Sequence, residues 1–272
     1  MPGRATVRIR PKQSLGQNFL VDDNIVRNIA RDIAPRPDDT VVEIGPGLGA
    51  LTRVLAPLVG RLVLVEIDER AIAELRKEFI APGVEIVHAD ILDVPFATLR
   101  RRGERGRLRV AGNLPYHLTS PILFKAFEEH AVIEDLTVMI QREVAQRILA
   151  TPGSRDYGIL GAMTRFFAEP RMLFTVSRNC FYPKPEVTSA VIQLRFLDAP
   201  AAPADPALYA TVVKTAFGKR RKMLRNSLLY LPYDEEIAAA VMAAHPGLME
   251  KRPEHLSVAE FAALANTLKA QL

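Results

Sequence analysis

Four consecutive residues after an apolar run carry the groups best suited to chemistry in this chain: Asn113, Leu114, Pro115 and Tyr116, in the stretch VAGNLPYHL. The Asn113 side-chain oxygen and the Leu114 carbonyl are two acceptors that can take both hydrogens of a conjugated amine such as adenine N6. Pro115 biases Leu114 towards an extended conformation, which aims that carbonyl. The Tyr116 ring offers a face for a base flipped out of its stack. The alternative is a turn before a helix, with Asn113 as its cap and Tyr116 in the core.

A glycine-rich loop supplies a second group of candidates. The stretch VVEIGPGLGALT places Gly45, Gly47 and Gly49 after an apolar run, where glycines allow a tight turn and a close approach to a ligand. Glu66 ends the next apolar run, 21 positions after residue 45, the spacing at which a carboxylate accepts hydrogen bonds from a ribose diol. We therefore expect a ribose-bearing cofactor. Gly45-x-Gly47-x-x-Ala50 also matches the dinucleotide-binding pattern, so the kind of cofactor stays open. The non-functional alternative is a plain glycine turn beside a surface glutamate.

A third acidic residue, Asp90 in VHADIL, ends the next predicted strand. Its carboxylate suits the amino group of an adenine, and it suits the cap of a helix equally well. With Asn113, four successive strand ends direct polar groups to one edge of the predicted sheet. We find no Lys, His or Tyr-x-x-x-Lys arrangement suited to hydride transfer, which disfavours a nicotinamide-dependent dehydrogenase.

Alternating strands and helices must position these residues. The patterns predict strands at 40–44, 61–67, 84–89, 108–112, 136–141, 171–177 and 188–196. They predict helices at 22–34, where an Asp pair supplies the cap, and at 49–58, 69–79 and 120–130. Apolar strands that alternate with helices predict an α/β fold, a Rossmann-like and mostly parallel sheet with helices on both faces.

The alternation stops near residue 198. LDAPAAPADPA, rich in proline and alanine, predicts a linker at 199–206. Only helical patterns follow, at 207–217, 221–230, 234–244 and 257–269. We therefore expect a basic flexible N-terminal arm at 1–17, a Rossmann-like domain at 18–198, and a small helical domain at 207–272.

The composition of the 272 residues is that of a globular protein, 49% hydrophobic and 25% charged. The single cysteine, Cys180, excludes an intrachain disulfide, and we expect a reducing, cytoplasmic compartment. No apolar run has the length of a membrane span, and the basic start MPGRATVRIRPKQ has no apolar stretch behind it, unlike a signal peptide.

The net charge of +5 and the isoelectric point near 9.4 fit a polyanionic partner. The basic residues cluster in GKRRKMLRNSL, where Arg220, Arg221, Lys222 and Arg225 crowd the start of an expected helix. We expect this cluster to contact RNA phosphates, with a solvated basic face as the alternative. The second basic run, at 99–109, is expected to be a solvated loop.

The ordered set of motifs resembles the ribosomal RNA adenine N6-dimethyltransferases from about Lys12 to the C-terminus. The resemblance depends on SLGQNFL (14–20), VVEIGPGLGALT (41–52), LVEID (64–68), HADIL (88–92), GNLPYHLTSPIL (112–123), FYPKPEVTSAVIQL (181–194) and AFGKRRKMLRNSL (216–228). It implies S-adenosylmethionine as the methyl donor. At the residue after NLPY the chain has His117, where relatives often carry a smaller polar residue, and we assign it no role.

The resemblance also implies roles for single residues. Asn18 and Leu20 match positions that close over the cofactor, and Gly45 matches the glycine under its methionine part. Glu66 matches the ribose ligand, Asp90 the adenine ligand, and Asn113 the residue that bridges cofactor and target amine. Phe181 matches an aromatic residue expected to sandwich the target base opposite Tyr116.

The implied activity is S-adenosylmethionine-dependent dimethylation of the N6 amines of two adjacent adenosines near the 3′ end of small-subunit (16S) rRNA during ribosome biogenesis. The expected partner is that rRNA in the immature small subunit, and the expected enzyme is a cytoplasmic monomer that needs no metal. The alternatives are a large-subunit rRNA methyltransferase of the antibiotic-resistance type, a mitochondrial transcription-factor relative and a ribosome-assembly binding factor. The RRKMLRNSL segment favours the small-subunit enzyme, and the absence of a transit peptide disfavours the mitochondrial relative.

Overall fold

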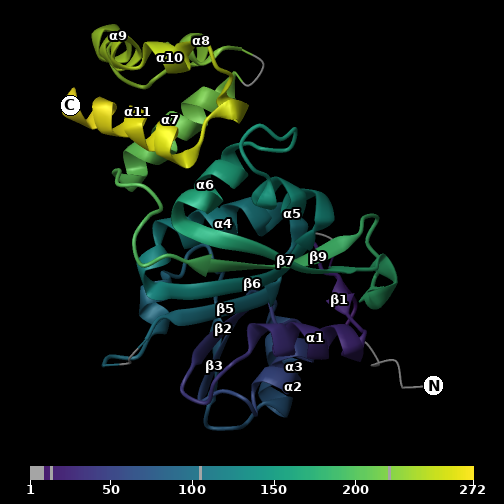
Figure 1. Cartoon of the computed structure of the whole chain (residues 1–272). Helices are drawn as coiled ribbons and strands as arrows, with labels where there is room; N and C mark the ends of the chain where they lie inside the picture. The colour runs from purple at the N-terminus through teal and green to yellow at the C-terminus, as the bar shows by residue number, and fades with distance from the viewer. Residues whose placement is uncertain (1–8, 13–14, 104–105, 220–221) are drawn as a thin grey trace. The chain divides into compact units, whose positions relative to one another are not determined.

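The computed structural model describes residues 9–12, 15–103, 106–219 and 222–272. Its contacts divide the chain into two compact units. The first runs to Ala145 and resumes at Arg171–Phe196, and the second comprises Gln146–Pro170 and Leu197–Leu272. Figure 1 follows the chain from one unit into the other. Among the described residues, no helix combines the length and the apolar character that a bilayer crossing requires.

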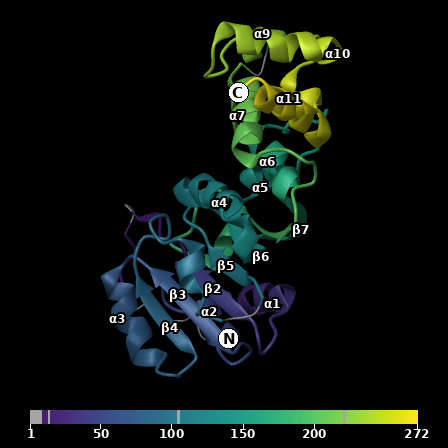
Figure 2. The ribbon, with the colours of Figure 1, turned by 90° about the vertical axis from the view of Figure 1, so that its left-hand side faces the viewer.

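Within the described part of the chain, seven strands form the main sheet in the order β4–β3–β2–β5–β6–β9–β7. Their bounds are β2 Thr40–Ile44, β3 Arg61–Glu66, β4 Val84–His88, β5 Leu108–Asn113, β6 Ile133–Gln141, β7 Ala168–Val176 and β9 Ser189–Phe196. Strands β2 to β6 pair in parallel, and β9 runs antiparallel to β6. This confirms the predicted sheet, and the turned view in Figure 2 shows β4 beside α3 (Glu69–Glu78).

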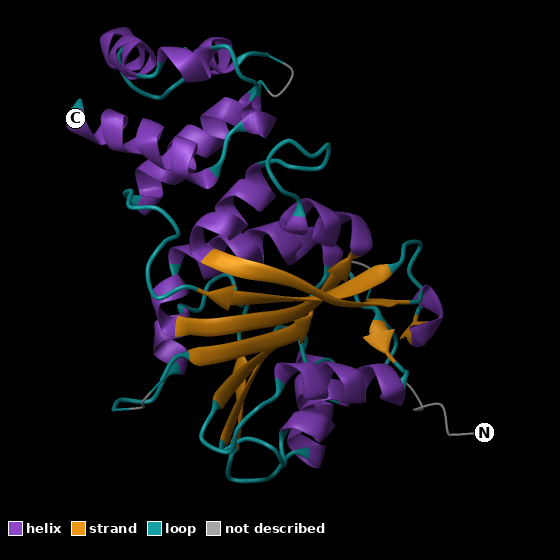
Figure 3. Ribbon diagram, viewed as in Figure 1, coloured by secondary structure: helices purple, strands orange, loops and turns teal. Residues whose placement is uncertain are grey.

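Helices cover both faces of the sheet (Figure 3). One face carries α1 (Asp23–Ile33), α2 (Ala50–Leu55) and α3, and the opposite face carries α4 (Thr119–Glu128). The helix α5 (Arg142–Leu149) follows β6. Because side chains alternate along a strand, Leu62 and Leu64 of β3 enter the core beneath α1 and α2. As predicted, an Asp caps α1: the Asp22 carboxylate accepts hydrogen bonds from two backbone N–H groups of the first turn.

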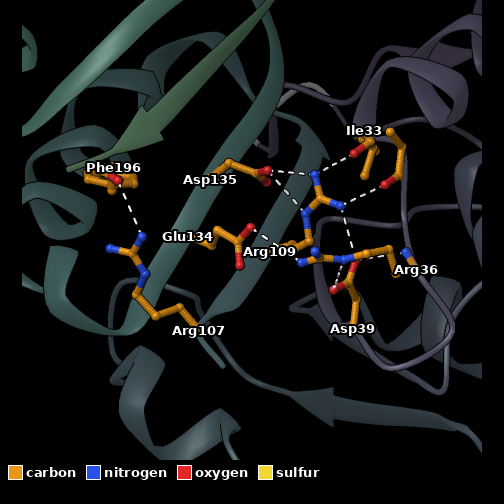
Figure 4. A network of polar contacts seen from close by, with 9 residues as sticks. Ile33, Arg36, Asp39, Arg107, Arg109, Glu134, Asp135 and Phe196 are labelled. Carbon is orange, nitrogen blue, oxygen red and sulfur yellow. Dashed lines mark hydrogen bonds and ion pairs between the residues drawn. The ribbon is translucent and has the colours of Figure 1, made fainter. Parts of the chain in front are cut away.

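A buried ion network fixes α1 to the amino end of the sheet (Figure 4). The guanidinium of Arg109, near the start of β5, donates five hydrogen bonds. Two go to Asp135 at 3.1 and 2.6 Å, one goes to Asp39 at 3.0 Å, and two go to the carbonyls of Ile33 and Ala34 at the end of α1. An arginine has five N–H donors, so all of them are used.

The second unit is built mainly from helices, which confirms the predicted C-terminal helical region. Its helices are α6 Ile159–Phe167, α7 Pro206–Gly218, α8 Leu224–Leu228, α9 Glu235–Ala244, α10 Pro246–Met249 and α11 Val258–Ala270. Aromatic rings form its centre: Tyr209 stacks on Phe166 with 3.8 Å between the ring centroids, and Tyr209 and Phe261 make a T-shaped contact.

The contacts place the start of the second unit differently from the predicted boundaries. Residues 146–170 belong to it, although we expected them in the Rossmann-like domain, because α6 supplies the partner ring of Tyr209. The predicted linker at 199–206 also packs within this unit. Ala202 is buried, the Ala201 N–H donates to the Phe166 carbonyl at 2.8 Å, and Pro203 accepts a hydrogen bond from Asn266. The segment 199–206 is therefore packed against its own unit, although its sequence lacks helical or strand periodicity and predicted a linker.

Candidate active site

A pocket of about 450 Å³ opens at the carboxyl ends of the parallel strands. Its lining combines the glycine loop after β2, the end of β3, the turn after β4, the NLPY stretch after β5 and residues 15–21. The structure brings nine predicted site residues together in this lining: Asn18, Leu20, Gly45, Glu66, Asp90, Asn113, Leu114, Pro115 and Tyr116. The volume lies in the range of small-molecule sites.

The glycine loop leaves the space that a bound molecule needs. Gly45 has φ +62°, and a Cβ added there would meet no atom within 4 Å, so its backbone faces open room in the pocket. Gly47 has φ +55°, and a Cβ there would approach the Phe19 ring to 3.0 Å. Side chains rarely adopt this left-handed conformation, so both positions favour glycine. This is the kind of backbone platform that a nucleoside cofactor requires.

Glu66 is held rigidly at the end of β3. Its carboxylate accepts hydrogen bonds from the backbone N–H groups of Gly47 at 3.0 Å, and of Ile67 and Asp68 at 2.9 Å. Burial raises the pKa of Glu66, and these three hydrogen bonds act in the opposite direction. The Ile67 and Asp68 N–H groups both donate to Oε1, whereas Oε2 accepts from Gly47 alone and keeps a lone pair for a ribose hydroxyl.

Asp90 occupies a turn and not the cap of a helix. Its Oδ1 accepts a hydrogen bond from the Leu92 N–H at 2.9 Å, which orders the turn after β4. The side chain is half-buried and lines the pocket. Asp90 thus caps no helix, and among the described residues the structure records no hydrogen bond to its Oδ2, the oxygen that we expect to face a ligand.

The NLPY stretch is fixed at several points. The Asn113 amide donates from Nδ2 to the Asn18 carbonyl at 2.8 Å, so the geometry assigns its nitrogen to that contact. Among the residues that the structure describes, no donor reaches its Oδ1. The Leu114 N–H donates to the Met139 carbonyl, and the Tyr116 hydroxyl lies 2.8 Å from Ser189 Oγ. The amide oxygen of Asn113 and the ring of Tyr116 are therefore presented by a rigid support.

Phe181 lies elsewhere. It pairs with Leu20 where the short strands β1 (Phe19–Leu20) and β8 (Phe181–Tyr182) form a two-stranded sheet, and it is 5% exposed within the core beside α1. It is not among the residues that line the pocket. Its stacking opposite Tyr116 stays a prediction that this position does not support. The exposed ring of the same strand belongs to Tyr182.

Part of the predicted flexible arm is fixed. Residues 1–8 and 13–14 lie outside the described residues, but Gln17 donates to Asp68 at 2.8 Å. The His117 ring, which we gave no role, packs on Gly16: a Cβ there would lie 3.1 Å from the ring. The N-terminal stretch from Gly16 thus forms a wall of the pocket.

Sequence reasoning missed Glu43. It sits in the middle of β2 at 2% exposure, lines the pocket and accepts a hydrogen bond from the Thr52 hydroxyl at 2.7 Å. Burial raises its pKa to about 7, with the nearby Glu66 charge contributing in the same direction and Thr52 opposing it. The available signal was an acid inside an otherwise apolar strand, directly before the glycine loop.

The basic cluster of the second unit is only partly visible. Arg220 and Arg221 lie outside the described residues. The helix expected at 221–230 is shorter, since α8 begins at Leu224, and Lys222 precedes it in a turn. Arg225 is exposed and forms an ion pair with Glu250 at 2.5 Å. Contact of these residues with RNA phosphates stays a prediction.

The other expectations concern groups outside the pocket. In the basic run at 99–109, Arg101 forms an ion pair with Glu85. Among the described residues, no three His, Cys, Asp or Glu side chains are grouped so that they could hold a metal ion.

Known proteins resemble the chain in sequence over nearly its whole length. "Ribosomal RNA small subunit methyltransferase A" of Moorella thermoacetica is 40% identical, with 98% of each chain covered. The protein of the same name from Aromatoleum aromaticum is 42% identical, with 96% of each chain covered.

Solved structures agree on the fold. A dimethyladenosine transferase from Plasmodium falciparum gives a TM-score of 0.76 at 22% identity, over 93% of this chain and 98% of that one. The 23S rRNA methyltransferase ErmE gives 0.64 at 30% identity, over 93% of this chain and all of that one. The family model "Ribosomal RNA adenine dimethylase" matches residues 8–269. With this match and the pocket geometry, the chain belongs to the ribosomal RNA adenine dimethylase family.

Proposed function

We propose that the chain dimethylates the N6 amines of two adjacent adenosines near the 3′ end of small-subunit (16S) rRNA, with S-adenosylmethionine as methyl donor. The observation that carries the chemistry is the orientation of the Asn113 amide. Its nitrogen is engaged by the Asn18 carbonyl, so its oxygen is the atom offered to an amine in the pocket. The small-subunit target is supported by relatives of that name at 40–42% identity.

The residues present fit the donor. The open backbone of Gly45 suits the methionine part, the carboxylate of Glu66 suits the ribose hydroxyls, and the second oxygen of Asp90 suits the adenine amino group. Asn18 and Leu20 close the site from the N-terminal side. When bound, S-adenosylmethionine supplies a methyl group on a sulfonium, whose sulfur leaves as a neutral thioether.

The chain's own contribution is to position and activate the amine. The Asn113 Oδ1 and the Leu114 carbonyl accept the two N6 hydrogens, which withdraws the nitrogen lone pair from conjugation with the ring. The hydrogen bond between the Tyr116 hydroxyl and Ser189 fixes the orientation of the ring. The face of this ring stacks on the target base. Positioning of this kind accounts for a large part of the rate without a strong general base.

The proposed partner is the rRNA of the immature small subunit, bound by a monomer in the cytoplasm. The net charge of +5 and the basic residues around Lys222 support a polyanionic partner. A second candidate target is the large-subunit rRNA, because ErmE is 30% identical to this chain over its full length. A further alternative is a ribosome-assembly factor in which binding, not methylation, is the main role.

The test is to incubate the protein and labelled donor with undermethylated small subunits and, in parallel, with large subunits, and to map methylated adenosines by mass spectrometry. We expect two neighbouring dimethylated adenosines near the 3′ end of the small-subunit rRNA. Label in the large-subunit rRNA alone, or stable binding to small subunits without any label, would contradict the proposal.

A further inference from the structure

A buried carboxylate next to the pocket has no part in the chemistry described so far. Asp68 lies in the turn between β3 and α3, its side chain is 0% exposed, and it does not line the pocket. It caps α3 by accepting from the Arg70 N–H at 3.2 Å. The Arg70 guanidinium adds two hydrogen bonds to Asp68, at 3.0 and 2.6 Å.

The N-terminal segment docks on this carboxylate. Gln17 donates from Nε2 to Asp68 Oδ2 at 2.8 Å, and its own amide oxygen accepts from the Lys12 N–H at 2.8 Å. The Lys12 ammonium lies 3.7 Å from the same carboxylate. Arg70 in turn donates to the Arg10 carbonyl at 2.9 Å. Side chains of one turn thus hold backbone and side-chain groups of a segment some 50 to 60 positions away.

The two tied segments contribute two walls of the cofactor pocket, one at residues 15–21 and one at the end of β3. The residue after Gln17 is Asn18, whose carbonyl orients the Asn113 amide. On the other side, the Asp68 N–H donates to Glu66, the ribose-binding carboxylate of the proposal. A shift at Asp68 therefore displaces groups on both walls.

We propose that Asp68 is a positioning residue, which acts through Gln17 to hold the Gly16–Leu20 wall in place so that the S-adenosylmethionine site is formed before the donor binds. This rests on the cofactor site alone and not on which RNA is methylated. A carboxylate suits the position because the described groups that contact its oxygens, from Gln17, Arg70 and Lys12, are all donors. An asparagine would turn an N–H₂ towards Gln17 or Arg70.

The ionisation of Asp68 fits this role. The hydrogen bonds from Arg70 hold its pKa well below the usual range, with Gln17 contributing in the same direction and burial opposing it. The carboxylate is therefore charged at every pH at which the protein would be assayed.

The experiment is a double-mutant cycle with Gln17→Leu, Asp68→Asn and the double variant, read out as the calorimetric dissociation constant of S-adenosylmethionine without RNA. Each single variant is expected to weaken donor binding about 5- to 20-fold, the range expected of lost preorganisation. The double variant is expected to bind no more weakly than Asp68→Asn, since both changes break one contact. For Asp68→Asn, whose residue does not line the pocket, kcat at saturating donor should stay within about twofold of the wild type while the KM for the donor rises.

Gln17→Leu leaves the α3 cap intact, so it separates positioning from helix stability. The matched control is Asp205→Asn, at an Asp that caps α7 of the second unit by accepting from two backbone N–H groups. It should leave donor affinity unchanged. Unchanged donor affinity in Gln17→Leu, or losses that simply add in the double variant, would overturn the inference. Neither result bears on the rRNA target, which the methylation map tests separately.

Discussion

Arg109 and Asn113 lie four positions apart, near the two ends of strand β5, and serve opposite purposes. At the amino end, Arg109 uses all five of its donors on Asp39, Asp135 and the end of α1. At the carboxyl end, Asn113 uses its nitrogen and keeps its oxygen towards the pocket. We call the Arg109 end the closed end, because its charged groups pair with one another. We call the Asn113 end the open end, because it presents an acceptor to a ligand. Arg109 does not line the pocket, whereas Asn113 does. We therefore expect changes at Arg109 to lower the stability of the fold and changes at Asn113 to lower activity.

The largest expected effect is at the closed end. Arg109→Met leaves Asp135 buried without its cation and Asp39 with Arg36 alone, and should lower the free energy of unfolding by about 3–5 kcal/mol. Arg36 offers a matched control, since it contacts the same Asp39 from an exposed position. Arg36→Met should cost about 1 kcal/mol or less. Urea unfolding of both variants checks this. Equal losses in the free energy of unfolding would show that the buried network contributes no more to stability than the exposed ion pair.

Glu43 differs from Asp39 and Asp135, because the described part of the chain shows no ion pair for this buried acid. Its pKa is raised to about 7 by burial, so the folded state holds a proton that the unfolded state releases. The stabilisation from this neutral carboxyl group is fully present below about pH 4.5 and is lost as the pH rises through about 7. A gap of about 2.5 pKa units corresponds to about 3 kcal/mol. Glu43→Gln should therefore flatten the pH dependence of the free energy of unfolding between about pH 4.5 and 7. If wild type and variant show parallel pH profiles, Glu43 is not the cause.

At the open end, Asn113→Ala should reduce the rate of methyl transfer by about 10²-fold or more, comparable to the loss of one preorganised catalytic hydrogen bond. Single-turnover rates at saturating donor are the appropriate measurement, because Asn113 also adjoins the cofactor site. RNA affinity serves as the internal reference and should change far less. A near-normal rate at saturating donor rules the role out.

The smallest expected effect concerns two basic residues of the second unit, Arg225 and Lys222. Arg225 is paired with Glu250, whereas the structure records no ion pair for the Lys222 side chain among the described residues. If Lys222 contacts an RNA phosphate, Lys222→Ala should lower the slope of log affinity against log salt by about 0.7–0.9. Arg225→Ala should change it less. Affinities over a salt series check both, and a slope that neither variant moves supports a merely solvated basic face.

Local patterns were sufficient to predict the open end. Strands with apolar runs end in Gly45, Glu66, Asp90 and Asn113, and a parallel sheet brings successive strand ends to one edge. The strands, the first helices and the placement of these four residues in the pocket therefore followed from spacing. The family resemblance added Asn18 and Leu20, which spacing alone did not indicate.

Contacts between distant residues were not predictable in this way. The partners of Arg109 lie 26 to 76 positions away, and Gln17 lies 51 positions from Asp68. The boundary of the second unit was misplaced for the same reason, because the ring on which Tyr209 stacks belongs to α6. Phe181 was assigned by resemblance, and the pairing of β1 with β8 places it in the core. No periodicity in a single sequence encodes such pairings.

The most direct test of the division between the two ends combines ligand binding with unfolding. Urea unfolding of the wild type, Arg109→Met and Glu66→Ala is measured with and without S-adenosylmethionine at 100 times the wild-type dissociation constant. A ligand at that concentration stabilises the folded state by about 2.7 kcal/mol. We expect this full gain for the wild type and for Arg109→Met. Glu66→Ala should lose about 1.5–3 kcal/mol of donor binding, so its gain should fall to about 1.4 kcal/mol or less. A full gain in Glu66→Ala, or a lost gain in Arg109→Met, would contradict the account.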